Sequence, residues 1–337
     1  MRTTLNALHE PLFMNRPDQS RLFINNVLLP RCGLRPLDPN SEKFAYFNAI
    51  ERCIFSLLQE KGEIMEENSH QVVIEKWEGG TPHSGRVFAA VFAHSDDLAI
   101  FAGGLIFKLI SEGYTGYFIK TTNDEMDSYD LSMAETVFRI YNETVEVTSF
   151  LGLEKLYSLD YKNHYLEHGQ LTEIRHRLIT LFRFLKVDTV ISFDPWGHYE
   201  ENPDHYITGH AVEQASWTSG RQLDLPELTD MGLAPKFVTR KYLVARGPQL
   251  VNRVVDITPV AEKKVEAIKI HKTPVDNMLR TYMDLHPGEK IEADAFIRGE
   301  FMRKADDKYG VAYVEKYHYI DETASFSFMR DDKNSVG

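Results

Sequence analysis

The sequence predicts an α/β fold in which helices cover both faces of a doubly wound, mostly parallel sheet. From about Arg86 onward, apolar segments of strand length alternate with amphipathic segments of helix length, a pattern typical of βαβ units. Two of the strand segments, Arg86–Ala93 and Val187–Phe193, are mostly apolar, as expected for strands buried on both faces. With 337 residues, 43% of them hydrophobic, the chain can enclose a large core.

The expected elements follow one another in a regular order. Strands are expected at Gln71–Trp77, Arg86–Ala93, Gly116–Thr122, Leu156–Leu159, Val187–Phe193, Lys236–Ala245 and Tyr309–Tyr319. Helices are expected at Ser41–Glu60, Leu98–Gly113, Leu131–Leu151, Leu171–Lys186, His205–Trp217 and Thr258–Ile270, with a further helical piece after Asp276. From residue 86 onward this alternation is Rossmann-like.

Composition divides the chain into three parts. Residues 1–85 are expected to form an N-terminal extension, an irregular proline-containing arm followed by a helix and an edge strand. Gly79, Gly80 and Pro82 mark its boundary. Residues 86–320 contain the alternating elements and form the main domain, and residues 321–337 form a C-terminal tail.

Charge and cysteine content narrow the functional class. The formal net charge of −12 argues against nucleic acid or an anionic membrane surface as the main partner. The two cysteines, Cys32 and Cys53, are expected to be free thiols. Because the sequence shows neither a secretory signal pattern nor an apolar run long enough to span a membrane, we expect a cytoplasmic protein without a membrane span.

A cluster of polar residues, His94, Ser95, Asp96 and Asp97, directly follows the apolar strand Arg86–Ala93. It lies at the strand-to-helix turn, where open α/β sheets bind ligands. Imidazole and carboxylate are good zinc ligands, and one of two adjacent aspartates can bind a metal while the other acts as a base. The alternative is that the aspartates only cap the helix. A histidine and two aspartates are costly to bury at the end of an apolar strand without a partner, which favours a site.

A second polar cluster follows the strand Val187–Phe193. Its candidate metal ligands are Asp194, His198, Asp204, His205 and His210. His205 stands near the start of the following helix, whereas His210, five residues later, is expected to point away from it. Together the two clusters offer two histidines and one aspartate, a common catalytic zinc arrangement when a fourth position stays open.

The two clusters resemble the motifs of the PIG-L/LmbE family of zinc-dependent N-deacetylases. The sequence AHSDD at Ala93–Asp97, followed by Gly103 and Gly104, resembles the family's A-H-P-D-D and Gly-Gly. The sequence NPDH at Asn202–His205 resembles the family's H-P-D-H, and weaker similarity extends from Arg86 to Tyr319. The resemblance implies a deacetylase domain that acts on N-acetylglucosamine-type groups.

Carried over by position, the resemblance implies that His94, Asp97 and His205 bind zinc and that Asp96 is the general base. Zn²⁺ is the expected cofactor, although the same ligands also suit manganese, iron or nickel. Asp204 is expected to orient a neighbouring imidazole or a ligand.

Asn202 departs from the family pattern, which has a histidine at this position. An amide can donate a hydrogen bond to the developing oxyanion but cannot act as a general acid near neutral pH. The candidates for the proton donor are therefore His198, Tyr199 and Asp96 in its protonated form.

Four residues are candidate substrate contacts. Arg139 resembles a substrate-binding arginine of some family members, and the alternative is an ion pair with Glu143 on a solvated helix face. Trp196 and Tyr199 are candidates for a wall on which a sugar stacks. His271 is either a pocket residue or a charge at a helix end.

The sequence therefore predicts a zinc-dependent hydrolase that removes an N-acetyl group from an amino sugar or an amino-sugar conjugate. The alternatives are an amidase that cleaves a larger conjugate, and a binding protein that retains the metal without turnover. The expected partner is a small amino-sugar substrate, and neither nucleic acid nor membrane. Since relatives in the family often form homo-oligomers, the resemblance also makes a homo-oligomer an alternative to a monomer.

Overall fold

The computed structural model describes residues 72–197 and 200–323. They fall within a compact unit that spans Gln71–Gly337. The arm and helix expected before residue 71 lie outside the described residues, and so does most of the expected tail. The chain division at residues 85 and 320 thus stays a prediction. Within the described ranges, no helix combines the length and apolar character needed to cross a membrane.

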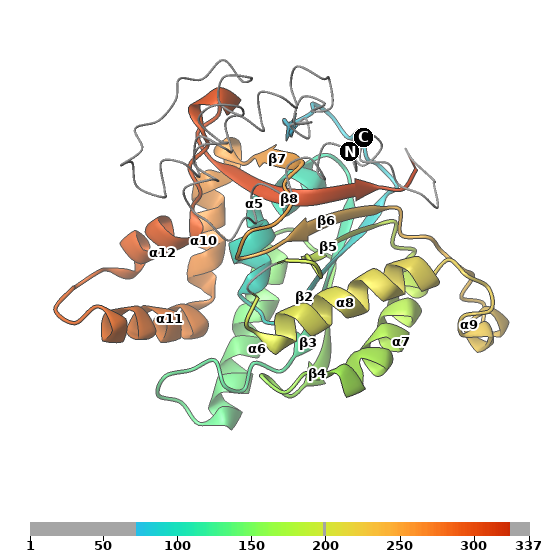
Figure 1. Cartoon of the computed structure of the whole chain (residues 1–337), viewed down its shortest axis with the longest axis horizontal. Helices are drawn as coiled ribbons and strands as arrows, with labels where there is room; N and C mark the ends of the chain where they lie inside the picture. The colour runs from blue at the N-terminus through green and yellow to red at the C-terminus, as the bar shows by residue number, and fades with distance from the viewer. Residues whose placement is uncertain (1–71, 198–199, 324–337) are drawn as a thin grey trace, which may run out of the picture. The chain divides into compact units, whose positions relative to one another are not determined.

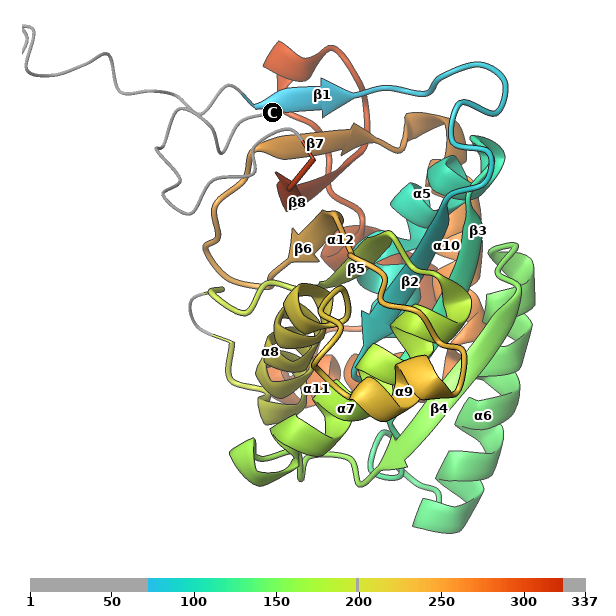
Figure 2. The same ribbon diagram turned by 90° about the vertical axis from the view of Figure 1, so that its right-hand side faces the viewer.

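A mixed sheet forms the centre of the described chain (Figures 1 and 2). Its eight strands among these residues are, in spatial order, β1 (Val73–Glu75), β7 (Arg253–Asp256), β8 (Val314–Asp321), β6 (Arg240–Val244), β5 (Thr189–Phe193), β2 (Val87–Phe92), β3 (Thr115–Thr122) and β4 (Lys155–Tyr161). β8 runs antiparallel to both of its neighbours, and the other pairs are parallel. The predicted α/β fold with a mostly parallel sheet is confirmed.

Helices cover both faces of this sheet. The first face carries α5 (Asp97–Ser111), α6 (Met133–Phe150) and α10 (Ala261–Ile270), and the second carries α7 (His168–Leu185) and α8 (Pro203–Thr218). The alternation of side chains along β2 explains the two layers, since Phe88 and Phe92 face the first and Ala89 and Val91 face the second. The remaining helices are α9 (Pro226–Asp230), α11 (Lys272–Leu285) and α12 (Ala293–Phe301), with single 3₁₀ turns at Thr258–Val260 and Asp307–Tyr309.

The strand β7 has no counterpart in the sequence prediction. Its four residues, RVVD, are too few to show the alternation by which a strand is recognised. It forms because it is paired on both sides, with β1 in parallel and with β8 in antiparallel orientation. The short strand expected at the edge of the sheet is present as β1.

The order of the strands places a topological switch point between β2 and β5. From β2 the chain proceeds through α5 to β3 on one side, and β5 lies on the other side of β2. Helices that follow these two strands pack on opposite faces of the sheet. Loops diverge at such a point and leave a crevice at the carboxyl ends of the strands, where ligands bind in open α/β sheets.

Helix α5 approaches its neighbours closely at Gly104. A Cβ atom there would lie only 2.3 Å from Cγ2 of Ile257 and 3.1 Å from Oε1 of Glu315. The buried Glu315 carboxylate accepts hydrogen bonds from the backbone N–H of Gly104 and of Leu105, at 2.9 and 2.8 Å. Nζ of Lys264 donates to the same carboxylate at 2.6 Å. The glycine therefore allows a buried ion pair to lock α5 against β8 and α10.

We expect Gly104→Ala to destabilise the fold by about 1–3 kcal/mol, the usual effect of overpacking a core. Gly299→Ala in α12 is the matched control, because a Cβ atom there would meet no heavy atom within 4 Å. Replacing a helical glycine with alanine should stabilise the protein by up to about 1 kcal/mol. Urea unfolding of the two variants measures both effects, and equal free energies of unfolding would contradict the packing argument.

Candidate metal centre

The end of β2 and the start of α5 position His94 and Asp97. β2 ends at Phe92 and α5 begins at Asp97, so a tight turn at the sheet edge separates them. The backbone N–H of His94 donates a hydrogen bond to Oδ2 of Asp97 at 2.8 Å. This bond turns the two side chains toward the same point. Both residues are buried, with 5% and 4% of their surface exposed.

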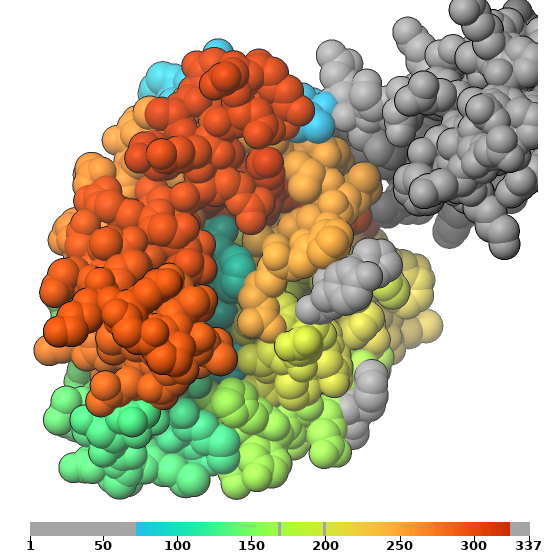
Figure 3. Space-filling view, turned by 60° about the vertical axis from the view of Figure 1, so that its left-hand side comes forward, coloured from blue at the N-terminus to red at the C-terminus, as the bar shows by residue number. Residues whose placement is uncertain are grey.

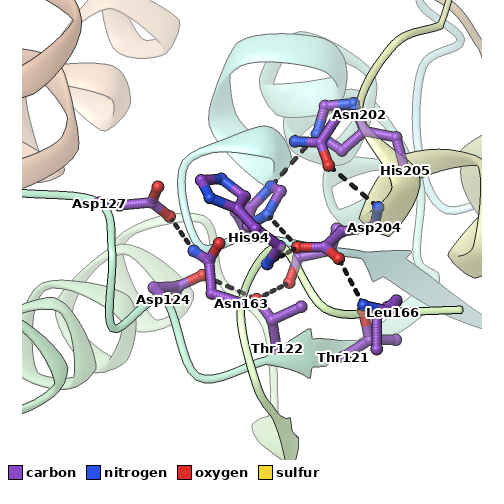
Figure 4. Close-up of polar contacts among 12 residues, drawn as sticks. His94, Thr121, Thr122, Asp124, Asp127, Asn163, Leu166, Asn202, Asp204 and His205 are labelled. Carbon is purple, nitrogen blue, oxygen red and sulfur yellow. Dashed lines mark hydrogen bonds and ion pairs between the residues drawn. The ribbon is translucent and has the colours of Figure 1, made fainter. Parts of the chain in front are cut away.

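His205 reaches the same point from the first turn of α8 (Figure 4). Its Nε2 lies 3.2 Å from Nδ1 of His94 and 3.4 Å from Oδ1 of Asp97. Nδ1 of His94 lies 3.3 Å from Oδ2 of Asp97. Among the described residues these three form a buried group whose potential ligand atoms all lie within 4.8 Å of one another.

The spacing of this group fits a divalent metal ion. Ligand atoms held about 2.0–2.1 Å from a tetrahedral zinc lie roughly 3.3 Å apart, close to the 3.2–3.4 Å between the three side chains. Two neutral imidazoles and one carboxylate are also a suitable donor set. The three residues would leave a fourth position open to the neighbouring cavity. The sequence prediction that His94, Asp97 and His205 come together therefore agrees with the geometry.

Asp204 fixes the orientation of the His94 ring. Its Oδ2 lies 3.1 Å from Nε2 of His94, on the side of the ring away from the centre. The same carboxylate accepts hydrogen bonds from the backbone N–H of His164 at 2.6 Å and of Leu166 at 3.1 Å. A proton on Nε2 leaves Nδ1 with its lone pair directed at the centre. This contact is the one that an orienting role needs, and the role itself stays a prediction.

Glu200 stands in the corresponding place beside His205, and sequence reasoning does not identify it. Its Oε2 lies 3.2 Å from Nδ1 of His205, and its side chain is only 8% exposed. Arg246 forms an ion pair with the same carboxylate. Burial would raise the pKa of Glu200, but the contacts with His205 and Arg246 outweigh it and lower the pKa to about 2. The Phe193 ring stacks on the His205 imidazole, with the two ring centroids 4.0 Å apart.

Asp96 is the carboxylate left outside the ligand group. It occupies the N-cap position of α5 but makes no side-chain capping hydrogen bond, which argues against a purely structural role. It lines a cavity of about 230 Å³ together with His94, Asp97 and His205. Burial, followed by the negative charges of Asp97 and Asp127, raises the pKa of Asp96 well above its usual range. For Asp97, the facing His205 and His94 overcome the effect of burial and lower the pKa.

Asp127 and Asn163 extend the site away from α8 (Figure 4). Asp127 lines the cavity, and Nδ2 of Asn163 donates to its Oδ2 at 2.7 Å. Burial raises the pKa of Asp127 to about 7, with the charge of His94 opposing and that of Asp124 contributing. The sequence contains the polar loop NDEMDSYD after β3, but which of its acids faces the cavity depends on how the loop folds.

Asn202 combines a structural position with a place in the cavity wall. It is the N-cap of α8, and its Oδ1 accepts a hydrogen bond from the backbone N–H of Asp204 at 3.0 Å. Asparagine is among the best residues for this capping geometry. Asn202 also lines the cavity, and the catalytic part expected for it stays a prediction.

Of the predicted substrate contacts, the described residues Arg139, Trp196 and His271 are not among those that line this cavity. Arg139 lies on the exposed face of α6, and Trp196 is 60% exposed with its ring edge-on to His210. Neither is among the described residues that line the cavity. His271 is fully buried, its ring nitrogens have no hydrogen-bond partner among the described residues, and burial lowers its pKa to about 3.

His198 and Tyr199 lie outside the described residues. The alternative partner of Arg139, Glu143, accepts hydrogen bonds from the backbone N–H and Oγ1 of Thr273 at the start of α11. The roles expected for Arg139, Trp196, Tyr199 and His271 in substrate binding, and for His198 in catalysis, stay predictions.

Comparison with known proteins connects this site to a family. Residues 89–216 match the family model described as PIG-L: GlcNAc-PI de-N-acetylase. The chain is 29% identical over 184 residues to the diacetylchitobiose deacetylase of Thermococcus kodakarensis, which covers 53% of this chain and 67% of that protein. It is 27% identical over 204 residues to the probable N-acetyl-alpha-D-glucosaminyl L-malate deacetylase 2 of Bacillus anthracis, covering 58% and 85%.

Solved structures show the same fold. The N,N'-diacetylchitobiose deacetylase from Pyrococcus horikoshii, complexed with its inhibitor MPG, superposes with a TM-score of 0.60 and 24% identity over 85% of this chain and 96% of that one. The conserved protein TT1542 from Thermus thermophilus gives a TM-score of 0.51 and 18% identity, covering 72% and 99%.

We expect Glu200→Gln to weaken metal binding by about 10–100-fold, the usual effect of losing a carboxylate that orients a ligating histidine. Glu201→Gln is the matched control, because Glu201 is exposed and next in sequence. Its affinity should stay close to that of the unmodified protein. Competition with a chromophoric chelator measures both affinities without any substrate. Equal affinities for the two variants would show that Glu200 does not support His205.

Metal affinity should fall as the pH is lowered. Burial lowers the pKa of His94, but the charge of Asp97 and the contact with Asp204 outweigh it and raise the pKa well above its usual range. In the metal-free protein His94 therefore keeps its proton to a higher pH than an ordinary histidine, and a metal must displace it. Below that pKa, affinity should drop about tenfold per pH unit. Calorimetry in buffers of different ionisation enthalpy counts the released proton, and a count of zero would contradict the prediction.

Proposed function

The chain belongs to the PIG-L/LmbE family of deacetylases, and from this premise we propose that it removes the N-acetyl group of an amino sugar or an amino-sugar conjugate. The observation that supports the proposal is the convergence of His94, Asp97 and His205 beside Asp96, which stays free of the ligand group. The two curated relatives are named for a diacetylated disaccharide and for an N-acetylglucosaminyl malate. An N-acetylated amino sugar is the substrate class common to both.

His94, Asp97 and His205 are the residues that would hold the metal. A divalent ion bound there supplies Lewis acidity, which lowers the pKa of water from 15.7 toward roughly 7 and polarises a carbonyl oxygen. Zinc is the ion we propose, because the donor set and the ligand spacing suit tetrahedral geometry. Reconstitution with zinc, manganese, iron or nickel, followed by activity measurements, tests this choice.

Asp96 is assigned as the general base. Its carboxylate takes a proton from the attacking water and later returns that proton to the nitrogen of the leaving amine. A carboxyl group with a raised pKa holds a transferred proton more readily, which suits the second step, and the environment of Asp96 raises its pKa through burial and two neighbouring negative charges. One residue can thus replace the general acid that the family histidine would supply at position 202.

Asn202 is assigned to the carbonyl oxygen of the acetyl group. Because its Oδ1 is held by the backbone N–H of Asp204, its Nδ2 is the part of the amide left to donate. A neutral donor of this kind stabilises a developing oxyanion without supplying a proton. Asp127, whose carboxylate is held by Asn163, is placed to accept a hydrogen bond from a sugar hydroxyl group.

Acetate release tests the proposed function directly. The metal-loaded protein is incubated with a panel of N-acetylated amino sugars, with and without a chelator. Chelator-sensitive acetate release supports the proposal. Absence of release from every member, with the metal bound, would overturn it and favour either an amidase that cleaves a larger conjugate or a binding protein without turnover.

Asp96→Asn should keep the metal and lower kcat by about 10²–10⁴-fold, because it removes the base but none of the ligands. Asp130→Asn is the control, since Asp130 is exposed in the loop before α6 and its activity should be retained. Metal content and acetate release are measured on the same samples. Full activity of Asp96→Asn would show that the base is another residue.

A further inference from the structure

Helix α6 carries an apolar stripe on the side that points away from the sheet. Its members Phe138, Tyr141 and Val145 are 70%, 52% and 45% exposed. They recur at intervals of three and four residues, so they lie in one line along the helix. Every other helix among the described residues has at most one exposed large apolar side chain. Exposed apolar surface gathered on one element in this way marks a place where another molecule binds.

The contacts that hold α6 in the fold use its other sides. Ile140, Thr144 and Val147 are buried and turn the opposite side of the helix toward the core. A third side meets α11, where Glu143 accepts hydrogen bonds from the backbone N–H and Oγ1 of Thr273. Figure 3 shows the green surface of α6 beside the orange surface of α11. The described residues therefore leave the stripe open to a partner.

Two opposite charges lie along one edge of the stripe. Arg139 and Glu146 are exposed, and neither has a salt-bridge partner in the part of the chain that the structure describes. Seven residues are close to two turns of an α-helix, so both side chains lie on the same edge, roughly 10 Å apart along the axis. On the other edge Glu135 is already bound at the helix cap, and Asn142 and Ser149 are uncharged.

This arrangement is self-complementary for two antiparallel copies of the helix. In a symmetric dimer, a residue that contacts a second residue of the other copy is contacted by it in turn. A two-fold axis near Asn142 places Phe138 of each copy against Val145 of the other. The same axis brings Arg139 of each copy opposite Glu146 of the other, which gives two ion pairs per dimer. A parallel pair of helices would instead place like charges opposite each other.

We propose that the exposed face of α6 binds the same face of a second copy of this chain in antiparallel orientation and forms a symmetric dimer. The apolar stripe supplies the buried centre of the interface, and the charged edges fix its direction and register. No residue of the stripe lines the cavity of the metal centre. The proposal is therefore independent of the substrate.

Sedimentation velocity of the full chain at several concentrations tests whether this dimer forms. We expect a monomer–dimer equilibrium whose Kd rises by about tenfold or more in Phe138→Glu, because the variant buries a charge at the interface. Phe184→Glu is the matched control, since Phe184 is 58% exposed but lies on α7, at the other face of the sheet. Its Kd should equal that of the unmodified chain. A chain that stays monomeric at every concentration, or equal Kd values for the two variants, would overturn the proposal.

Charge reversal tests the antiparallel direction. Arg139→Glu and Glu146→Arg should each raise Kd by about threefold to tenfold, because each places like charges opposite each other at two symmetric positions. The double variant Arg139→Glu, Glu146→Arg should dimerise like the unmodified chain.

A mixture of the two single variants provides the control for folding. Their heterodimer pairs opposite charges at both positions, so the mixture should recover the affinity of the unmodified chain. Recovery excludes damage to the fold as the reason why each variant alone associates weakly. Failure of both the double variant and the mixture to recover the dimer would overturn the proposal.

Discussion

The parallel pairing of β2 with β5 is the constraint on which the site depends. Residues Phe88–Ala90 pair with Thr189–Ile191, so both strands end at the same edge of the sheet. His94 and Asp97 follow one strand and His205 follows the other, although about 110 residues separate them in the chain. A change of register by two residues would move one strand end by about 6.6 Å relative to the other. That displacement is larger than any distance within the ligand group, so the backbone ladder sets the ligand spacing.

The metal centre brings several buried ionisable groups together, and the carboxylates of Asp204 and Glu200 reduce the cost of burying them. Buried ionisable groups are costly unless each is paired and hydrogen-bonded. Each imidazole has a carboxylate on the nitrogen that points away from the centre, Asp204 for His94 and Glu200 for His205. These carboxylates are held in turn, Asp204 by two backbone N–H groups and Glu200 by Arg246. These contacts orient the two imidazole rings before a metal ion binds.

The sequence predicts what depends on local order and misses what depends on distant contacts. His94, Asp97 and His205 are recognisable because each lies where a buried strand gives way to a helix, and such positions meet at one sheet edge. Glu200 carries no comparable signal, since its role depends on Arg246, which follows β6 and lies 46 residues away. β8 is expected as a strand, but its antiparallel direction follows from pairing with β6 and β7. For Arg139 the sequence suggests a role but not a direction, because its position in a helix does not determine whether the helix turns it toward the cavity, and its role stays a prediction.

The walls of the cleft come from two parts of the sequence. A second cavity, of about 460 Å³, shares Phe101 and Arg246 with the cavity of the metal centre, and the two form one cleft. The three proposed ligands His94, Asp97 and His205 lie within 89–216, the range that matches the family model. Apart from Ile100 and Phe101, the walls of the second cavity lie between Val244 and Lys316, outside that range. The sheet edge holds the centre rigidly, whereas helix ends and loops form the walls and tolerate change more readily. Substitutions in those walls can change which substrates fit the cleft without moving the metal-binding side chains.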